Sequence, residues 1–366
     1  MKLVVFSDLH LDAPFTWLAE AAVARRRRDA LRTVLGRISA LAHAEKADAL
    51  LCAGDLYEHD RITPDTAAFL VRTFADLHPM PVYLTPGNHD WYGPSSIYAR
   101  ADWSPNVHVF AAPRFEPVKL AEGVTLWGAG HDRPAGTANL LRGFHVEGDG
   151  VHLALFHGSE IGWLRAQGSD KVAHAPFEAT DLDAAGFTHA FVGHYHCPRD
   201  APRYTYPGNP DPLAFGETGD RGAVVASLRT DGRLGIERRT VAVTRVHEVN
   251  VDVSGCSDRA EIQARIRAAS DHLDGLLRVT LWGELAPNVD VRLADFVVGA
   301  PGVEGVAWRR ADLRTGYDLD AIGHEQTVRG QFVRDVREAD LPEEERQGVL
   351  LTGLRALDGR DDLEVF

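Results

Sequence analysis

Short apolar runs that end in polar clusters recur along the first part of the chain. The runs cover residues 3–6, 49–53, 82–84, 153–156 and 190–192. Continuous apolar runs of this length, bounded by turn-forming residues, predict buried strands. Helix-like stretches, such as residues 19–45 and 64–77, lie between them. Because strands and helices alternate, we expect an α/β fold whose sheets are covered on both faces.

The polar clusters that follow these runs carry side chains able to bind metal ions. There are seven such residues: Asp8, His10, Asp55, Asn88, His157, His194 and His196. In open α/β sheets the ligand sites lie at the carboxyl ends of the strands. We therefore expect side chains from distant parts of the sequence to meet at one edge. Residues i and i+2 of an extended segment point the same way, so Asp8 with His10, and His194 with His196, would each face this site.

The chemistry of these donors favours a hard or borderline divalent metal, because oxygens and imidazoles are present without a thiolate. We expect Mn²⁺, with Fe²⁺, Zn²⁺ or Mg²⁺ as alternatives. Seven donors exceed the need of one ion with an open position, and they fit two ions that share a carboxylate. Two ions about 3.5–4 Å apart hold the attacking and leaving oxygens of a displacement at phosphorus, and they activate a shared water as hydroxide.

Each cluster taken alone predicts only a turn or a satisfied polar strand end. Gly87-Asn88, for example, is a common turn sequence. The metal-site interpretation depends on five clusters in order, each directly after an apolar run.

Composition and charge divide the chain near residue 245. The hydrophobic content of 45% and charged content of 25% are ordinary for a globular protein and exclude collagen-like and disordered classes. Residues 246–366 hold 24 acidic and 14 basic residues, so they carry −10 of the net charge of −14. Only three of the 17 histidines lie there. We expect two domains, residues 1–245 with the metal chemistry and residues 246–366.

The compartment is predicted from what the sequence contains at its start and in its cysteines. Three cysteines without paired spacing favour neither a disulfide framework nor a cysteine-type zinc site. The first apolar run is shorter than a signal peptide requires, and no run approaches the roughly 18 apolar residues of a membrane span. We expect a cytoplasmic protein that does not contact a membrane.

The ordered motifs resemble those of the calcineurin-like metallophosphoesterases. That family carries D-x-H, G-D, G-N-H-D, a later H and G-H-x-H, and all five occur between residues 8 and 196. The resemblance implies one metal held by Asp8, His10, Asp55 and His196. It implies a second metal held by Asp55, Asn88, His157 and His194, so that Asp55 bridges. His89 would stabilise the transition state or act as the general acid on the leaving oxygen.

Further segments resemble the SbcD-like and YhaO-like DNA-repair exonucleases. These are residues 6–15 (FSDLHLDAPF), 206–209 (YPGN) and 215–217 (FGE). The resemblance implies a two-sheet sandwich flanked by helices, with a smaller C-terminal α+β capping domain that contacts DNA or a partner. It also implies a homodimer that works with an SMC-like (SbcC-like) coiled-coil ATPase.

Several residues near the motifs are candidates for supporting roles. Glu58 stands where relatives carry Asp or His, and it would orient His89. His59 is a candidate substrate contact, with an exposed loop position as the alternative. Trp91 and Tyr92 would stack on a base or pack against their own loop. His131, followed by Asp132, would contact substrate or support the metal ligands, or belong to an ordinary loop.

Beyond residue 245 the patterns predict a helix over 259–276, a strand over 277–281 and a last helix over 342–357. The last helix carries an apolar stripe, which favours core packing, with docking of a partner ATPase as the alternative.

The sequence leaves three functions open. The leading prediction is a two-metal phosphodiesterase acting as a DNA exonuclease or endonuclease. The second is a metallophosphoesterase acting on a small nucleotide or a lipid-linked phosphoester. The third is a non-catalytic subunit of an ATPase complex, against which the intact donor set argues. The acidic charge does not exclude DNA, because residues 1–245 carry only −4 and two divalent ions would offset it.

Overall fold

The computed structural model describes residues 1–366 except 19, 167–171, 288, 290 and 360–366. The chain divides into two compact units, Met1–Arg245 and Val246–Phe366.

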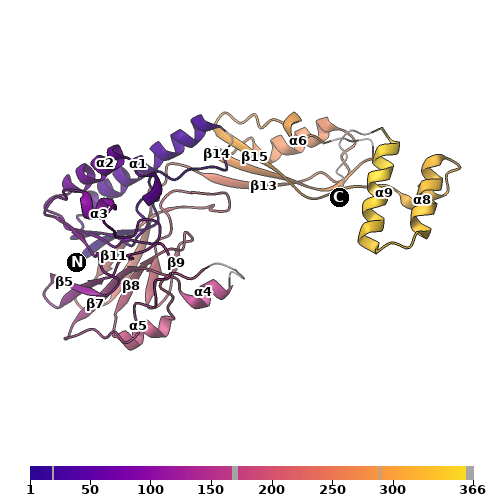
Figure 1. Ribbon diagram of the computed structural model, residues 1–366. Helices are drawn as coiled ribbons and strands as arrows, with labels where there is room; N and C mark the ends of the chain where they lie inside the picture. Colours follow the sequence, from indigo (N-terminus) through magenta and orange to yellow (C-terminus); the bar gives the residue numbers. More distant parts are fainter. Residues whose placement is uncertain (19, 167–171, 288, 290, 360–366) are drawn as a thin grey trace. The chain divides into compact units, whose positions relative to one another are not determined.

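The first unit contains two six-stranded sheets (Figure 1). In order across the first sheet, the strands are β12 (Leu234–Thr240), β11 (Gly222–Leu228), β1 (Lys2–Phe6), β2 (Ala49–Cys52), β3 (Val82–Leu84) and β4 (Val107–Val109). The second runs β5 (Glu116–Ala121), β6 (Val124–Gly128), β7 (Val151–His157), β8 (His189–Gly193), β10 (Tyr204–Tyr206) and β9 (Arg199–Asp200). The five predicted strands are confirmed as β1, β2, β3, β7 and β8. Strands β1, β2 and β3 run parallel in the first sheet, and β7 and β8 run parallel in the second. Within each sheet, the carboxyl ends of these strands therefore lie at the same edge.

The alternation of side chains along the strands builds the layers. Leu3 and Val5 of β1 join the buried cluster between the two sheets, whereas Val4 and Phe6 join the cluster beneath the helices. The second sheet shows the same alternation. Leu155 of β7 packs between the two sheets, whereas its neighbours Ala154 and Phe156 pack in the cluster on the sheet's outer face. Both faces of each central strand are therefore apolar, which is why the sequence shows continuous rather than alternating runs.

Helices cover the outer faces of the two sheets. Over the first sheet lie α1 (Ala21–Ala44), α2 (Pro64–Ala75) and α3 (Ile97–Arg100). Helix α1 buries Leu31, Leu35 and Ile38, the spacing of one helical face. On the second sheet's side are α4 (Ile161–Ala166) and α5 (Ala179–Ala185). The predicted α/β fold of two sheets flanked by helices is confirmed.

The second unit is an α+β arrangement. Its parallel sheet consists of β13 (Val246–Asp252), β14 (Gly275–Leu285) and β15 (Val303–Thr315), and helix α6 (Arg259–Ser270) packs on it. Three helices follow, α7 (Leu319–Gly323), α8 (Val328–Glu338) and α9 (Glu343–Leu357).

Of two helices predicted for the second unit, one is shorter than predicted and the other is confirmed. The helix predicted over 259–276 ends at Ser270, and Gly275, with a φ of +79° that glycine readily adopts, begins strand β14. The last helix matches α9, and its Leu350 and Leu354 are buried against α8, so those two residues pack in the core. No helix among the described residues is long and apolar enough to cross a membrane.

Candidate metal centre

The strand ends of both sheets bring the seven predicted donors together. Asp8 and His10 follow β1, Asp55 follows β2 and Asn88 follows β3, while the second sheet supplies His157, His194 and His196 at the ends of β7 and β8. Direct contacts join the two sheets, since the His194 N–H donates to Asp8 Oδ1 at 3.0 Å and His157 Nδ1 lies 2.9 Å from the Ala53 carbonyl.

Asp55 lies between the two groups of donors. Its Oδ2 is 3.6 Å from His10 Nε2 and 3.2 Å from His157 Nε2. Its Oδ1 accepts the His89 backbone N–H at 2.8 Å. Burial opposes ionisation of Asp55, but the nearby imidazoles outweigh it and hold the pKa of this carboxyl well below its usual range. An ionised, buried carboxylate between two sets of imidazoles suits a bridging ligand, which stays a prediction.

Beside His157, possible metal-binding atoms of His157, Asn88 and His194 lie close together. The Ala53 carbonyl accepts the Nδ1–H of His157. Burial disfavours the charged ring, but the Asp55 carboxylate beside Nε2 raises the pKa of His157 to about 9, so a metal ion at Nε2 would displace a proton. That Nε2 lies 3.0 Å from Asn88 Oδ1, and His194 Nδ1 lies 3.2 Å from the same oxygen. Together with Asp55 these atoms form a cluster of acceptors that fits a divalent cation.

On the side of His10 a buried ring nitrogen makes no hydrogen bond with any described residue. Donor atoms of Asp8, His10 and His196 lie within 4.8 Å of one another. His10 Nε2 is buried and makes no hydrogen bond within the part of the chain that the structure describes. Its other nitrogen, Nδ1, is 2.7 Å from Glu58 Oε1. A carboxylate on the outer nitrogen presents Nε2 as a lone pair, the arrangement of metal-bound histidines.

Glu217 supports His196 in the same way, with Oε1 2.6 Å from His196 Nδ1. Its Oε2 accepts from Asn209 Nδ2 and from the Leu213 N–H, each at 2.6 Å. Arg221 closes the group by donating to the backbone carbonyls of Glu217 and His196. Residues 206–209 and 215–217 were expected only to resemble the exonucleases, and the role of Glu217 was not predicted because this loop gives no periodic signal.

Four of the seven donors have a positive backbone φ. Asp8, His10, Asp55 and His194 have φ values of +54°, +48°, +52° and +109°. This corrects the expectation of extended i, i+2 geometry at Asp8 and His10 and at the His194 segment. Such φ values are unfavourable for residues with a Cβ and are maintained at functional sites by the surrounding structure.

His89 and Glu58 form a hydrogen-bonded pair at the rim. His89 Nδ1 lies 3.0 Å from Glu58 Oε2, and 46% of the His89 side chain is exposed. The hydrogen bond to Glu58 raises the pKa of His89 to about 9. Burial opposes ionisation of Glu58, but hydrogen bonds from His10 and His89 lower its pKa to about 2. Glu58 thus contacts a predicted ligand and the predicted acid together.

The four candidate substrate contacts lie in different environments. His59 stacks on Trp91 with ring centroids 4.1 Å apart and an interplanar angle of 21°. Tyr92 packs partly against the core beneath the helices.

His131 is fully buried, with Nε2 2.8 Å from the His157 carbonyl and Nδ1 2.9 Å from Thr137 Oγ1. A substrate contact does not fit this position of His131. It supports the segment that ends in His157.

Two sheets whose strand ends carry this donor set define a metal-dependent phosphoester hydrolase. Residues 1–198 match the family described as calcineurin-like phosphoesterase, and the chain belongs to that family. The donor set is consistent with two divalent ions.

The individual relatives share 30% or less of their sequence with this chain. The chain is 30% identical over 258 residues to "Uncharacterized metallophosphoesterase YhaO" of Bacillus subtilis (strain 168), and the match covers 66% of this chain and 60% of that relative. Among solved structures, TT1561 of Thermus thermophilus is 16% identical with a TM-score of 0.40, covering 66% of this chain and 98% of that one. A dimetal phosphatase from Danio rerio is 12% identical with a TM-score of 0.39, covering 66% and 96%.

Proposed function

We propose that this protein is a two-metal phosphodiesterase that cleaves DNA. The observation that carries the choice of DNA is the His59–Trp91 stack beside His89. The His59 N–H donates to the His89 carbonyl at 3.0 Å, so the stack is fixed to the segment that carries the acid. Aromatic faces beside a phosphodiester site suit unstacked bases, each worth about 1–3 kcal/mol.

The chain's own residues divide the work at the centre. The seven donors would hold two divalent ions, which supply Lewis acidity and an activated water when bound. Glu58 accepts from Nδ1 of His89 and raises the pKa of His89 to about 9, so the ring is doubly protonated and carries a proton on Nε2 for the leaving oxygen. Asp55 holds the His89 segment through the backbone N–H, which keeps the acid in register with the metal ligands.

The direct test compares substrates. Purified protein with Mn²⁺ is incubated with linear duplex DNA, single-stranded DNA and cyclic nucleotides, alongside His89→Ala and Trp91→Ala. We expect DNA cleavage that falls by about 10²–10⁴ in His89→Ala. Trp91→Ala should weaken cleavage of DNA but leave hydrolysis of bis(p-nitrophenyl) phosphate unchanged. Cleavage of cyclic nucleotides without DNA degradation would replace this proposal by the small-substrate function. Metal binding without any phosphodiester cleavage would favour the non-catalytic subunit.

A homodimer with an SMC-like ATPase belongs to the same proposal. Val349 and Leu357 of α9 are 41% and 46% exposed, although Leu350 and Leu354 are buried. These exposed apolar residues support docking of a helical partner. Analytical ultracentrifugation of the purified chain tests the dimer, and a monomer at all concentrations would contradict it.

A further inference from the structure

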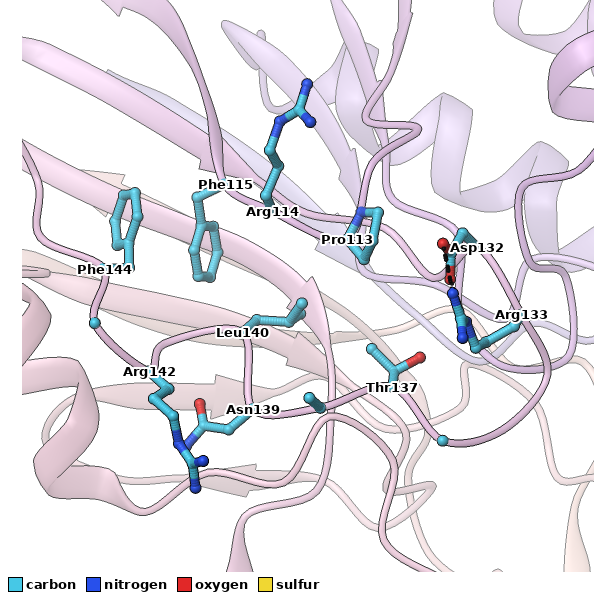
Figure 2. A pocket seen from close by; sticks show the side chains of 13 residues that line it. Pro113, Arg114, Phe115, Asp132, Arg133, Thr137, Asn139, Leu140, Arg142 and Phe144 are labelled. Carbon is cyan, nitrogen blue, oxygen red and sulfur yellow. Dashed lines mark hydrogen bonds and ion pairs between the residues drawn. The ribbon is translucent and has the colours of Figure 1, made fainter.

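A basic pocket of about 590 Å³ opens beside the second sheet (Figure 2). Three segments line it: Arg114 and Phe115 precede β5, Asp132 and Arg133 follow β6, and the loop to Phe144 carries Arg142. Figure 2 shows Arg114 and Arg142 on opposite sides of the pocket, with side chains that extend away from each other, and Arg133 beside Asp132 on a third side. We call this the arginine pocket.

The arginine pocket is positive in a chain of net charge −14. Its lining holds three arginines and one acidic residue, Asp132, which pairs with Arg133 at 2.8 Å. Arg114 lies 3.2 Å from Glu116, but both side chains are exposed and such a pair contributes little. Arg142 has no ion-pair or hydrogen-bond partner for its side chain among the described residues. Two guanidinium groups therefore remain available to an anion.

The arginine pocket and the metal centre share a wall. Thr137, which lines the pocket, lies 2.9 Å through Oγ1 from His131 Nδ1, and His131 Nε2 is 2.8 Å from the His157 carbonyl. The Tyr92 N–H donates to the His131 carbonyl at 2.7 Å, so the aromatic loop borders the same residue. His131 and Thr137 thus link the metal centre, the aromatic loop and the pocket through a continuous set of hydrogen bonds.

The pocket loop is held in place. Asn139 Nδ2 donates to Asp181 Oδ2 at 2.8 Å, and Asn139 Oδ1 accepts the Leu141 N–H at 2.8 Å. The Ala175 N–H donates to the Thr137 carbonyl at 3.0 Å. Hydrogen bonds thus join the loop that carries Arg142 to α5 and to the segment after α4. They hold the backbone of this loop in place.

We propose that the arginine pocket binds phosphate groups of a nucleic-acid strand whose scissile phosphate lies in the metal centre, an inference that rests on the proposed function. Guanidinium groups match phosphate oxygens in charge and in their paired hydrogen-bond geometry. A free nucleotide or inorganic phosphate shares this chemistry, and the experiment separates these sources.

The test removes the two available arginines together. The variant Arg114→Ala with Arg142→Ala is compared with wild type and with Arg229→Ala plus Arg233→Ala. The control pair lies at the β11–β12 turn, at the end of the first sheet opposite the metal centre, because β11 runs antiparallel to β1. Binding of a fluorescein-labelled single-stranded oligonucleotide is measured by anisotropy in EDTA at several salt concentrations.

We expect weaker binding only in the pocket variant. The slope of log K against log salt should fall by about 1.4, since each lost single-strand phosphate contact removes about 0.7. An unchanged slope, or equal loss in the control pair, would overturn the proposal. Calorimetric binding of phosphate or a mononucleotide that depends on these arginines, with oligonucleotide affinity unchanged, would also overturn it in favour of a free-anion site.

Hydrolysis of bis(p-nitrophenyl) phosphate with Mn²⁺ tests the proposed phosphodiesterase activity separately from strand binding by the arginine pocket. It should be equal in all three proteins, because neither arginine contacts the metal centre. If the wild type fails to hydrolyse it, the proposed function fails, while the anisotropy measurement still decides whether the pocket binds a strand.

Discussion

The carboxylate of Glu217 accepts a hydrogen bond from His196 Nδ1 at 2.6 Å, across a loop of the first unit. Asn209 and the Leu213 N–H hold the other oxygen of that carboxylate. His196 is therefore oriented by a carboxylate that is itself held on two sides.

Glu217→Gln should weaken metal binding, because the amide holds His196 less firmly and lowers its basicity. We expect a loss of about 10- to 100-fold in affinity for Mn²⁺. Isothermal titration calorimetry measures it, with the exposed Glu147→Gln as a matched control. Equal affinities in the two variants would contradict the role of Glu217.

Glu58 should affect both metal affinity and turnover, whereas His89 should affect only turnover. Its carboxylate bonds both His10 and His89, so Glu58→Gln should reduce Mn²⁺ affinity and turnover together. His89→Ala should lower the rate of DNA cleavage, whose alkoxide leaving group needs the acid, with Mn²⁺ affinity unchanged. A Glu58→Gln variant that binds Mn²⁺ like wild type would show that its contact with His10 is dispensable.

Gly193 should tolerate no side chain. A Cβ there would clash with the Ala53 carbonyl and lie 2.7 Å from His157 Nδ1. We expect Gly193→Ala to lower the free energy of unfolding by about 1–3 kcal/mol. Gly36→Ala is the control, since that exposed position in α1 has nothing within 4 Å, and it should gain about 0.5–1 kcal/mol. Urea denaturation measures both, and equal effects would contradict the close approach of β8 to Ala53.

His189 should make stability depend on pH. Burial lowers the pKa of this β8 histidine to about 4, below its ordinary value of 6.5. The unfolded chain therefore binds the proton more readily, and stability falls as the pH drops from about 6.5 towards 4, by up to about 1.4 kcal/mol per pH unit. His189→Gln, which retains a side chain able to bond Thr205, should flatten this dependence. Identical pH profiles would contradict it.

Much of the first unit was predictable because its central strands are apolar on both faces. Val4 and Val5 pack in different layers, yet both are apolar, so the run is visible without knowing the fold. The donors were visible because each lies in a polar cluster at the end of such a run.

The supporting residues were less accessible to prediction. Glu217 lies 21 residues after His196 in a loop, and its partner is set by tertiary structure. His131 is polar and follows a strand, as the donors do, but its burial at 0% exposure is a property of the folded chain. Strand β15 was missed because its exposed positions carry Arg309, Arg310 and Asp312, which interrupt the apolar pattern.

We propose that the strand ends form a two-metal centre in which Asp55 bridges the ions. Asp55→Asn replaces the shared carboxylate with an amide of the same shape. Metal analysis after dialysis against Mn²⁺ should find two ions per wild-type chain and neither in the variant. Two ions retained in Asp55→Asn would contradict the account.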